Sequence, residues 1–112
     1  MIGKLVVPRA RARQDIDDAL IYYLREAGDD VALRFIDALE AAYQHLSAHP
    51  ASGSLRYAYV LDLPGLRAWP LRGFPWLVFY SETGQHLDVW RVLHGSRDIP
   101  AWMGEALSLS DD

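Results

Sequence analysis

The stretch that most constrains the fold is residues 66–98, where three apolar segments are separated by a glycine and by a polar turn. Residues 66–72 and 86–93 alternate between apolar and polar side chains, whereas residues 74–80 are almost wholly apolar. Alternation is typical of a strand with one buried face, and a short continuous apolar run is typical of a central strand. Three strands joined at Gly73 and by a turn at residues 81–85 predict an antiparallel meander. Pro70 lacks a backbone donor and is expected at an edge or a bulge.

The side chains of these strands are too bulky for one covering layer. Six aromatic residues crowd the stretch: Trp69, Phe74, Trp76, Phe79, Tyr80 and Trp90. Strands of period two cannot bury all of them against a single helical layer, so a second covering partner is expected. In the third strand the alternation places Leu87, Val89 and Leu93 on one side, and Asp88, Trp90 and Val92 on the other.

Two amphipathic helices are expected before the sheet. Residues 9–27 and 30–49 repeat apolar side chains at steps of three and four, which predicts one apolar stripe on each helix. Gly28 is expected to end the first helix, and Asp29 or Asp30 to cap the second. Pro50 ends the second helix. A short β-branched strand at residues 4–7 precedes them and is ended by Pro8, which also suits a first helical position.

The remaining segments carry weaker signals. Residues 56–60 are expected as a short extended piece, residues 99–107 as a short helical turn, and residues 108–112 as a frayed acidic end. The predicted fold class is α+β: a strand, a two-helix hairpin and a three-stranded antiparallel meander, with the helices packed on one face of the sheet. Residues 1–98 are predicted to form a single domain, and residues 99–112 a C-terminal tail.

Composition restricts the function. The chain has 15 acidic and 11 basic residues, a net charge of −4, and proteins that bind nucleic acid through phosphates usually carry a basic excess. No direct DNA binding is therefore expected, although Arg67, Arg72, Arg91 and Arg97 lie in the sheet half. The chain has no cysteine and no apolar run near the ~20 residues that span a bilayer. A cytoplasmic location is expected.

The run His94-Gly95-Ser96-Arg97-Asp98 gathers the chemically active residue types. Neighbours in sequence do not easily reach the geometry of a hydrolase triad, and no G-x-S-x-G motif is present. His45 and His49 have the spacing of a helical metal pair, but the pattern H-E-x-x-H is absent, so neither a metal nor a cofactor is expected. Two interpretations stay open for the run: a turn after an exposed strand, or a binding role for Arg91, His94 and Arg97.

A set of residues in order along the chain resembles the ParE branch of the RelE/ParE toxin superfamily. These residues are Ala12-x-x-Asp15-Ile16, Tyr22-Tyr23, Ala32-x-x-Phe35, Leu39, Leu46-x-x-x-Pro50-x-x-Gly53, Leu66-Arg67, Phe74-Pro75-x-Leu77-x-Phe79-Tyr80 and Arg91-Val92-Leu93-His94-Gly95-x-Arg97-Asp98. No single motif is specific, but their order and spacing cover about nine-tenths of the chain.

The resemblance implies the toxin of a type II toxin–antitoxin pair that inhibits DNA gyrase by direct binding and is not an enzyme. It also implies a hetero-oligomer with a ParD-like antitoxin, which has a ribbon-helix-helix N-terminus and a C-terminal segment that wraps the toxin. The candidate target- or partner-binding residues are Arg67, Arg72, Trp76, Trp90, Arg91, His94 and Arg97.

The alternative within the superfamily is a RelE-like, ribosome-dependent mRNA endoribonuclease. Such an enzyme needs basic residues around the scissile phosphate and a general acid or base. In those relatives a basic residue lies on the strand that here reads Phe74-Pro75-Trp76-Leu77-Val78, which has no charged side chain, and Lys4 is the only lysine. Arg72, Arg91, His94 and Arg97 could still form a catalytic cluster.

Overall fold

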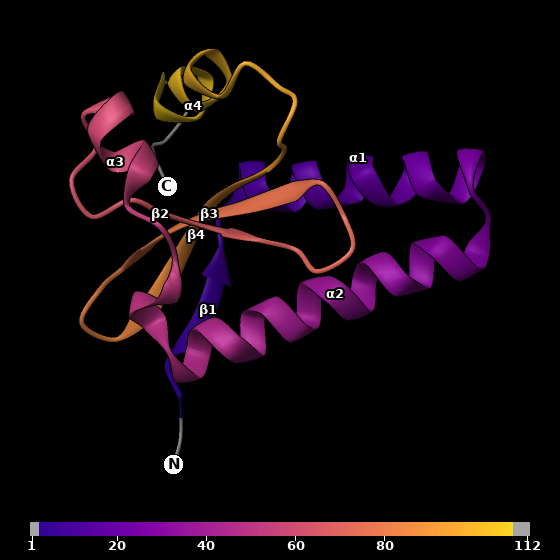
Figure 1. The fold of residues 1–112 in the computed structure, drawn as a ribbon, viewed down its shortest axis with the longest axis horizontal. Helices are drawn as coiled ribbons and strands as arrows, with labels where there is room; N and C mark the ends of the chain where they lie inside the picture. Colours follow the sequence, from indigo (N-terminus) through magenta and orange to yellow (C-terminus); the bar gives the residue numbers. More distant parts are fainter. Residues whose placement is uncertain (1–2, 109–112) are drawn as a thin grey trace.

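The computed structural model describes residues 3–108, with side chains described for residues 3–103. The helices and strands, in chain order, are β1 (Leu5–Pro8), α1 (Ala10–Glu26), α2 (Asp29–Ala48), the 3-10 turn η1 (Pro50–Ser52), α3 (Arg56–Leu61), β2 (Arg67–Pro70), β3 (Trp76–Glu82), β4 (His86–His94) and α4 (Ile99–Ser108). The predicted order of strand, helical hairpin and three consecutive strands is confirmed. Figure 1 shows α1 and α2 as a hairpin that extends beyond the sheet, on the side away from α3.

The sheet has the order β1-β4-β3-β2. β2, β3 and β4 form the predicted antiparallel meander, and β2 lies at an edge, as expected from Pro70. β1 is the exception in an otherwise antiparallel sheet, because it pairs with β4 in parallel, Leu5 opposite His86. The first strand of the chain thus lies beside the last, although the helical hairpin, α3, β2 and β3 all lie between them in the sequence.

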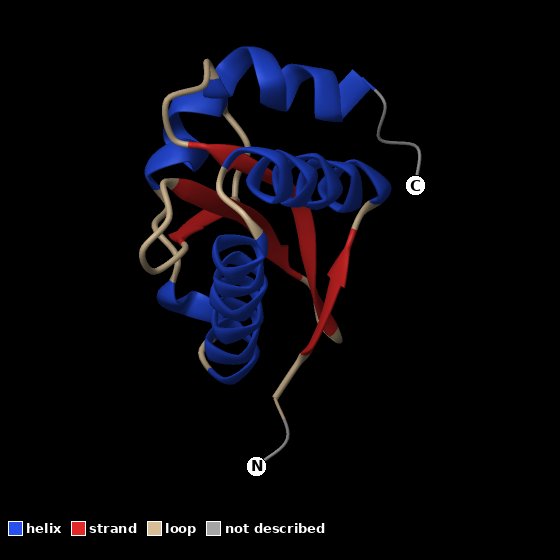
Figure 2. Ribbon diagram, turned by 90° about the vertical axis from the view of Figure 1, so that its right-hand side faces the viewer, coloured by secondary structure: helices blue, strands red, loops and turns tan. Residues whose placement is uncertain are grey.

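The two faces of the sheet carry two separate cores, and alternate residues of β3 point into each. Val78 and Tyr80 face the α1–α2 hairpin, in one cluster with Phe35 and Leu46 of α2. Phe79 belongs to a second cluster with Leu66, Leu93, Ile99 and Met103, which α3 and α4 cover. Figure 2 shows α4 lying across the end of the sheet, apart from α2.

This second core changes two expectations. The helical hairpin does pack on one face, but the chain's own α3 and α4 cover the other, so the aromatic residues of the sheet do not by themselves require an outside partner. Ile99 and Met103 of α4 are 4% and 0% exposed, so the core continues past a boundary drawn after Asp98. The expected frayed end lies outside the described residues from 109 onward.

The predicted extended piece at residues 56–60 is wrong, because these residues form α3. Its inward side chains are Tyr57, Ala58 and Leu61, and the ring of Tyr57 meets that of Phe79 edge to face at 5.1 Å. Six residues are fewer than two helical turns, too short for the apolar period to separate a helix from a strand.

A β-bulge changes the sidedness of β4. Phe79 pairs with Arg91 and Tyr80 with Val89, so Trp90 is an extra residue without a partner in β3. Leu87 and Val89 face the hairpin, as predicted to share one side, but beyond the bulge it is Val92 that faces the hairpin while Leu93 faces α3 and α4. The prediction for Val92 and Leu93 is therefore wrong, since period two holds only in a regular strand.

Element ends differ from prediction in three further places. α2 begins at Asp29 with Gly28 at its N-cap and no side-chain cap bond, so neither Asp29 nor Asp30 is the cap. Gly28 does end the hairpin's first helix, with a positive φ of 91° and its N–H donating to Tyr23 O. β3 runs from Trp76 to Glu82 because Phe74 and Pro75 belong to the preceding turn, and Pro8 is the last residue of β1.

Candidate binding site

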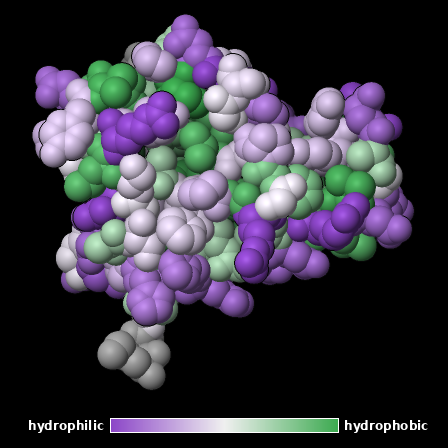
Figure 3. All heavy atoms as spheres, viewed as in Figure 1, coloured by the Kyte–Doolittle hydropathy of each residue, from purple (hydrophilic) through white to green (hydrophobic). Residues whose placement is uncertain are grey.

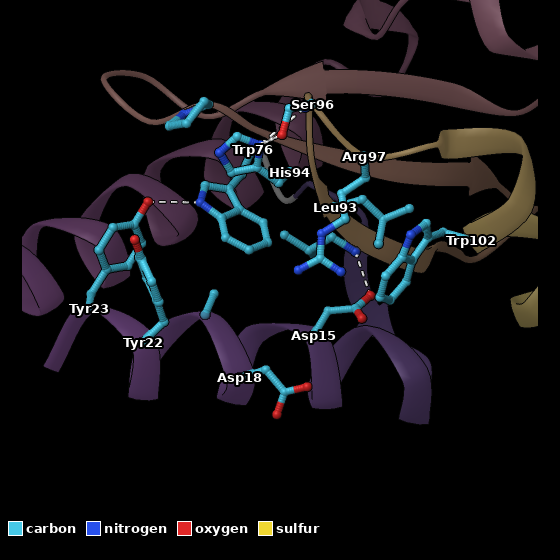
Figure 4. A pocket seen from close by; sticks show the side chains of 13 residues that line it. Asp15, Asp18, Tyr22, Tyr23, Trp76, Leu93, His94, Ser96, Arg97 and Trp102 are labelled. Atoms are coloured by element: carbon cyan, nitrogen blue, oxygen red, sulfur yellow. Dashed lines mark hydrogen bonds between the residues drawn. The ribbon is translucent and has the colours of Figure 1, made fainter. Parts of the chain in front are cut away.

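A hollow of about 560 Å³ opens between α1, the adjoining ends of β3 and β4, and the start of α4 (Figure 4). Four separate stretches of the chain supply its walls, two of them at the end of the sheet. They are Asp15, Asp18, Ala19, Tyr22 and Tyr23 of α1; Pro75, Trp76, Val92, Leu93, His94, Ser96 and Arg97 of the sheet end; and Trp102 of α4. Only the finished fold brings them together.

The base of the hollow rests on a buried ion pair. Arg91 is 0% exposed, and its Nε and Nη2 donate to Asp15 Oδ2 and Oδ1, each at 2.7 Å. Its Nη1 donates to the carbonyl of Trp102 at 2.7 Å. A bidentate arginine fixes both the distance and the plane of its carboxylate. Arg91 therefore locks α1, β4 and α4 together.

Asp15 also completes the sheet. β1 pairs with β4 only as far as Val89, so β4 has no strand neighbour on that side from the bulge onward. Asp15 Oδ2 accepts the backbone N–H of Val92 at 3.0 Å, in the place of a carbonyl from a further strand. A buried N–H left without a partner is costly, so this contact lets the sheet edge face α1.

The wall beside this base is aromatic. Trp76 is 7% exposed, and its Nε1 donates to the hydroxyl of Tyr23 at 2.8 Å. The His94 ring meets Trp76 edge to face at 5.4 Å. The backbone N–H of Ser96 lies 3.1 Å from His94 Nδ1. Because that N–H can only donate, Nδ1 is the acceptor, and the proton of a neutral His94 ring lies on Nε2.

Arg97 is the cation of the hollow. Its guanidinium lies 4.1 Å from the centre of the Trp102 ring, which holds it by a cation–π contact. Figure 4 shows its head pointing toward α1, into the space between Trp76 and Asp15. Among the side chains that the structure describes, none forms an ion pair or hydrogen bond with this guanidinium. The Arg97 guanidinium is therefore held in place by Trp102 and is available to pair with a ligand.

The sequence-predicted residues fall into two groups. Trp76, His94 and Arg97 line the hollow, with Arg91 buried beneath them. Arg91 was expected as an exposed contact, but in this conformation it is a structural residue.

The other three predicted residues lie elsewhere. Arg67 donates from Nη1 to the carbonyls of Ala51 and Gly53, at 3.1 and 2.8 Å. Trp90 lies under the guanidinium of Arg9 at 4.2 Å, and its Nε1 donates to Ser81 Oγ. Arg72 is exposed in the turn between β2 and β3 and does not line the hollow. The four residues that could have formed a catalytic cluster, Arg72, Arg91, His94 and Arg97, are therefore not gathered in the hollow, because Arg72 lies outside it and Arg91 is buried beneath it.

Sequence reasoning missed the residues that α1 and α4 contribute. For Asp15 a signal existed, because it falls on the buried stripe of α1 between Ala12 and Ala19. An acid within an apolar stripe indicates a buried cationic or hydrogen-bonding partner. For Trp102 no comparable signal existed, since residues 99–107 showed no pattern long enough to indicate which face is buried.

The charges favour binding over phosphodiester chemistry. Cleavage of a phosphodiester requires several cations around the phosphate, together with a positioned acid or base. Here Arg91 is neutralised by Asp15, Asp18 adds a carboxylate on the facing wall, and Arg97 with His94 are the remaining basic groups that line the hollow. Aromatic walls around a single available cation are typical of a recognition site.

The model of a protein family, described as ParE toxin of type II toxin-antitoxin system, parDE, matches residues 6–99. The chain belongs to the ParE toxin family. Toxin ParE3 of Caulobacter vibrioides is 30% identical over 92 residues, which cover 81% of this chain and 86% of that protein.

A solved structure has the same fold. This structure, of the chromosomal ParDE TA system from P. aeruginosa, superposes with a TM-score of 0.67, covering 82% of this chain and 96% of that one at 18% identity. The predicted α+β fold and the resemblance to ParE toxins are both confirmed. Within the described residues, no helix is long and apolar enough to cross a membrane.

Proposed function

We propose that this chain is a ParE toxin that inhibits DNA gyrase by direct protein binding and is neutralised by a ParD-like antitoxin. The family membership supports the toxin role, and the similar solved structure comes from a ParDE toxin–antitoxin system. In this proposal the antitoxin carries a ribbon-helix-helix N-terminus, the two proteins form a hetero-oligomer in the cytoplasm, and the toxin itself makes no direct DNA contact.

The observation that carries the non-enzymatic part is the Arg91–Asp15 pair. It places one of the two sheet-end arginines inside the protein, 0% exposed, so a single arginine remains directed into the hollow. The strand β3 adds no charged side chain before Glu82, at its far end. A site with these groups supports binding better than stabilisation of developing charge on a phosphate.

Exposed apolar side chains support a partner-binding role for the hairpin. Ile21, Tyr22, Leu24 and Leu33, near its tip, are 46, 58, 46 and 59% exposed. Figure 3 shows apolar residues gathered toward the end of the hairpin and again over α3. Apolar patches on a small protein are typical of protein interaction sites.

The test is a supercoiling assay with purified gyrase and the purified chain, together with growth curves after induction. We expect growth to stop without the antitoxin, and supercoiling to fall as toxin is added and to recover when antitoxin is added. A ParE protein that has been heated to denature it is the matched control for the supercoiling reaction. Unchanged supercoiling at a large excess of folded toxin contradicts the proposal.

A RelE-like endoribonuclease is the rival, and the observation in its favour is that His94 and Arg97 share one hollow. Primer extension on mRNA from induced cells separates the two functions. The rival predicts new ends inside translated codons, which disappear in His94→Ala and Arg97→Ala variants. Gyrase inhibition predicts no such ends.

A further inference from the structure

We propose that the hollow recognises an acidic side chain on a protein partner. The carboxylate pairs with Arg97, and an apolar side chain next to it in the partner packs against Trp76 and Tyr22. This inference rests on the proposed function only in taking the partner to be a protein. It assigns a ligand chemistry to a site that family membership leaves without one.

The first support is the state of Arg97. Its stem is held because the guanidinium stacks on Trp102 at 4.1 Å, and its head points into the hollow without an acidic partner among the described residues. An arginine fixed before binding loses less conformational entropy when it pairs. The three other arginines for which the structure gives a fixed polar partner, Arg9, Arg67 and Arg91, hold a carboxylate or backbone carbonyls.

The second support is the arrangement of His94 beside Arg97. Ser96 occupies Nδ1 of the His94 ring, through its N–H at 3.1 Å and its hydroxyl at 2.7 Å. The Nε2–H of the neutral tautomer is then a donor without a partner among the described residues. A carboxylate has two oxygens, and a guanidinium with a neighbouring imidazole N–H can serve both.

The negative charge on the wall opposite Arg97 favours a single carboxylate as the ligand over a nucleic-acid backbone. Asp15 and Asp18 of α1 line the hollow opposite Arg97, and the whole chain carries a net charge of −4. A chain of phosphates would meet these carboxylates at every position except the one beside Arg97, and its binding relies on several cations. A single carboxylate needs one cation, which is what the hollow offers.

The aromatic residues define the neighbouring group. The Trp76 indole and the Tyr22 ring line the hollow, and Tyr22 is 58% exposed, so the apolar surface continues from the hollow onto α1. A volume of about 560 Å³ is suited to one or two side chains and not to a whole helix. The predicted ligand is therefore an acidic residue next to an aromatic or aliphatic one, on a segment that continues along the hairpin.

The experiment titrates the purified full chain with two capped dipeptides, acetyl-Glu-Phe-amide and acetyl-Gln-Phe-amide, and follows the indole N–H signals of Trp76 and Trp102 by NMR. We expect the Glu peptide to shift both signals and to bind about tenfold or more tightly than the Gln peptide, because a hydrogen bond to a charged group is lost in the second. Inorganic phosphate and a short oligouridylate are titrated in parallel as phosphate probes.

The variants are Arg97→Gln, Arg97→Lys and, as the matched control, Arg72→Gln. Arg97→Gln is expected to weaken the Glu peptide about tenfold and leave the Gln peptide unchanged, whereas Arg97→Lys keeps part of the preference. Arg72→Gln removes an exposed arginine outside the hollow and should change neither. Both arginines are exposed, and equal thermal unfolding midpoints confirm that the variants fold.

Three outcomes of the peptide titrations overturn the inference: no shift with either peptide at millimolar concentration, equal affinity for the two peptides, or an unaltered preference in Arg97→Gln. Tighter binding of the oligouridylate than of the Glu peptide overturns it in favour of RNA. The gyrase assay is run on the same proteins. A parent protein that inhibits gyrase but binds the two peptides equally rejects this inference alone, and a parent protein that prefers the Glu peptide but does not inhibit gyrase rejects the proposed target alone.

Discussion

Arg91 and Asp15 lie 76 residues apart in the sequence and meet in the interior through two hydrogen bonds of 2.7 Å. Asp15 also accepts the Val92 N–H, and Arg91 also holds the Trp102 carbonyl. One pair of side chains thus joins the first long helix, the last strand and the last helix. The pair supports the hollow: Asp15 forms part of its wall, whereas Arg91 is fully buried behind it.

Replacement of Asp15 should show how much this pair stabilises the fold. Asp15→Asn leaves Arg91 as a buried charge without a counter-ion, and we expect a loss of about 3–5 kcal/mol in the free energy of unfolding. Urea titration followed by circular dichroism measures it. Asp17→Asn, on the exposed face of the same helix, is the control and should change little.

The pair should also be thermodynamically coupled. In the double variant Asp15→Leu with Arg91→Met, no buried charge remains, and replacement of a buried pair by apolar residues is often nearly neutral. We expect this variant to be more stable than either single variant. If the losses of the single variants add up in the double variant, the two residues act independently and the ion pair is not the unit of stability.

Gly53 lies where two segments approach closely. A Cβ at this position would stand 2.6 Å from Tyr80 Oη and 2.9 Å from Arg67 Cβ, and the Gly53 N–H donates to the same hydroxyl at 2.9 Å. We expect Gly53→Ala to destabilise the protein by about 1–3 kcal/mol through overpacking. Gly84→Ala is the matched control, since its Cβ would meet nothing within 4 Å. Equal midpoints of chemical unfolding for Gly53→Ala and the parent would show that the loop around Gly53 moves to accommodate the added methyl group without loss of stability.

Tyr43 should make stability depend on pH in the alkaline range. Burial raises the pKa of its phenol from 10.0 to about 12, and its buried hydroxyl has no hydrogen-bond partner among the described residues. Above pH 10 the unfolded chain loses this proton while the folded chain retains it. The folded state then binds more protons, so the free energy of unfolding falls as pH rises, by up to about 3 kcal/mol near pH 12.

Tyr43→Phe tests that assignment. At pH 7 we expect equal or slightly higher stability, by up to about 1 kcal/mol, because an unpaired buried hydroxyl is removed. Between pH 10 and 12 the variant should lose less stability than the parent. Burial also raises the pKa of Tyr80, so some alkaline dependence remains. Tyr22→Phe, on the surface, should follow the parent curve, and a Tyr43→Phe curve parallel to the parent would contradict the assignment.

Met103 tests whether α4 belongs to the core. It is 0% exposed and packs in the cluster of Leu66, Phe79 and Leu93. Met103→Ala should cost about 2–5 kcal/mol because it leaves a cavity, whereas Met103→Leu keeps the volume and should cost less than about 1.5 kcal/mol. Differential scanning calorimetry compares the two. A small effect of both substitutions would mean that α4 contributes little to the folded state.

The sequence predicts the elements of this fold well where the apolar period is long. The apolar stripes of α1 and α2 indicate helices, and the continuous apolar run of β3 indicates a central strand. The order of helices and strands in the α+β fold follows from these patterns. The short α3 and the sidedness of β4 do not follow. A six-residue helix has no resolvable period, and the bulge at Trp90 depends on how β4 pairs with β3, which no single strand encodes.

The site is less predictable than the fold. His94 and Arg97 are adjacent to a strand end and could be singled out from their residue types, and Trp76 from its place in the central strand. The role of Arg91 could not, because nothing near Arg91 in the sequence indicates that Asp15 lies beside it. A pairing across 76 residues is fixed by the tertiary fold alone. Because of this pairing, Arg91 stabilises the interior and is not the exposed contact that the sequence predicted.

The parallel pairing of β1 with β4 has a consequence for how the protein is made. Leu5 lies opposite His86, so β1 gains β4 as its strand neighbour only after about 80 further residues have been synthesised. Contacts between such distant residues form slowly and late in folding. A growing chain that has exposed only the hairpin and β2 has neither a closed sheet nor the walls of the hollow. The complete sheet and the walls of the hollow therefore form only after β4 has been synthesised.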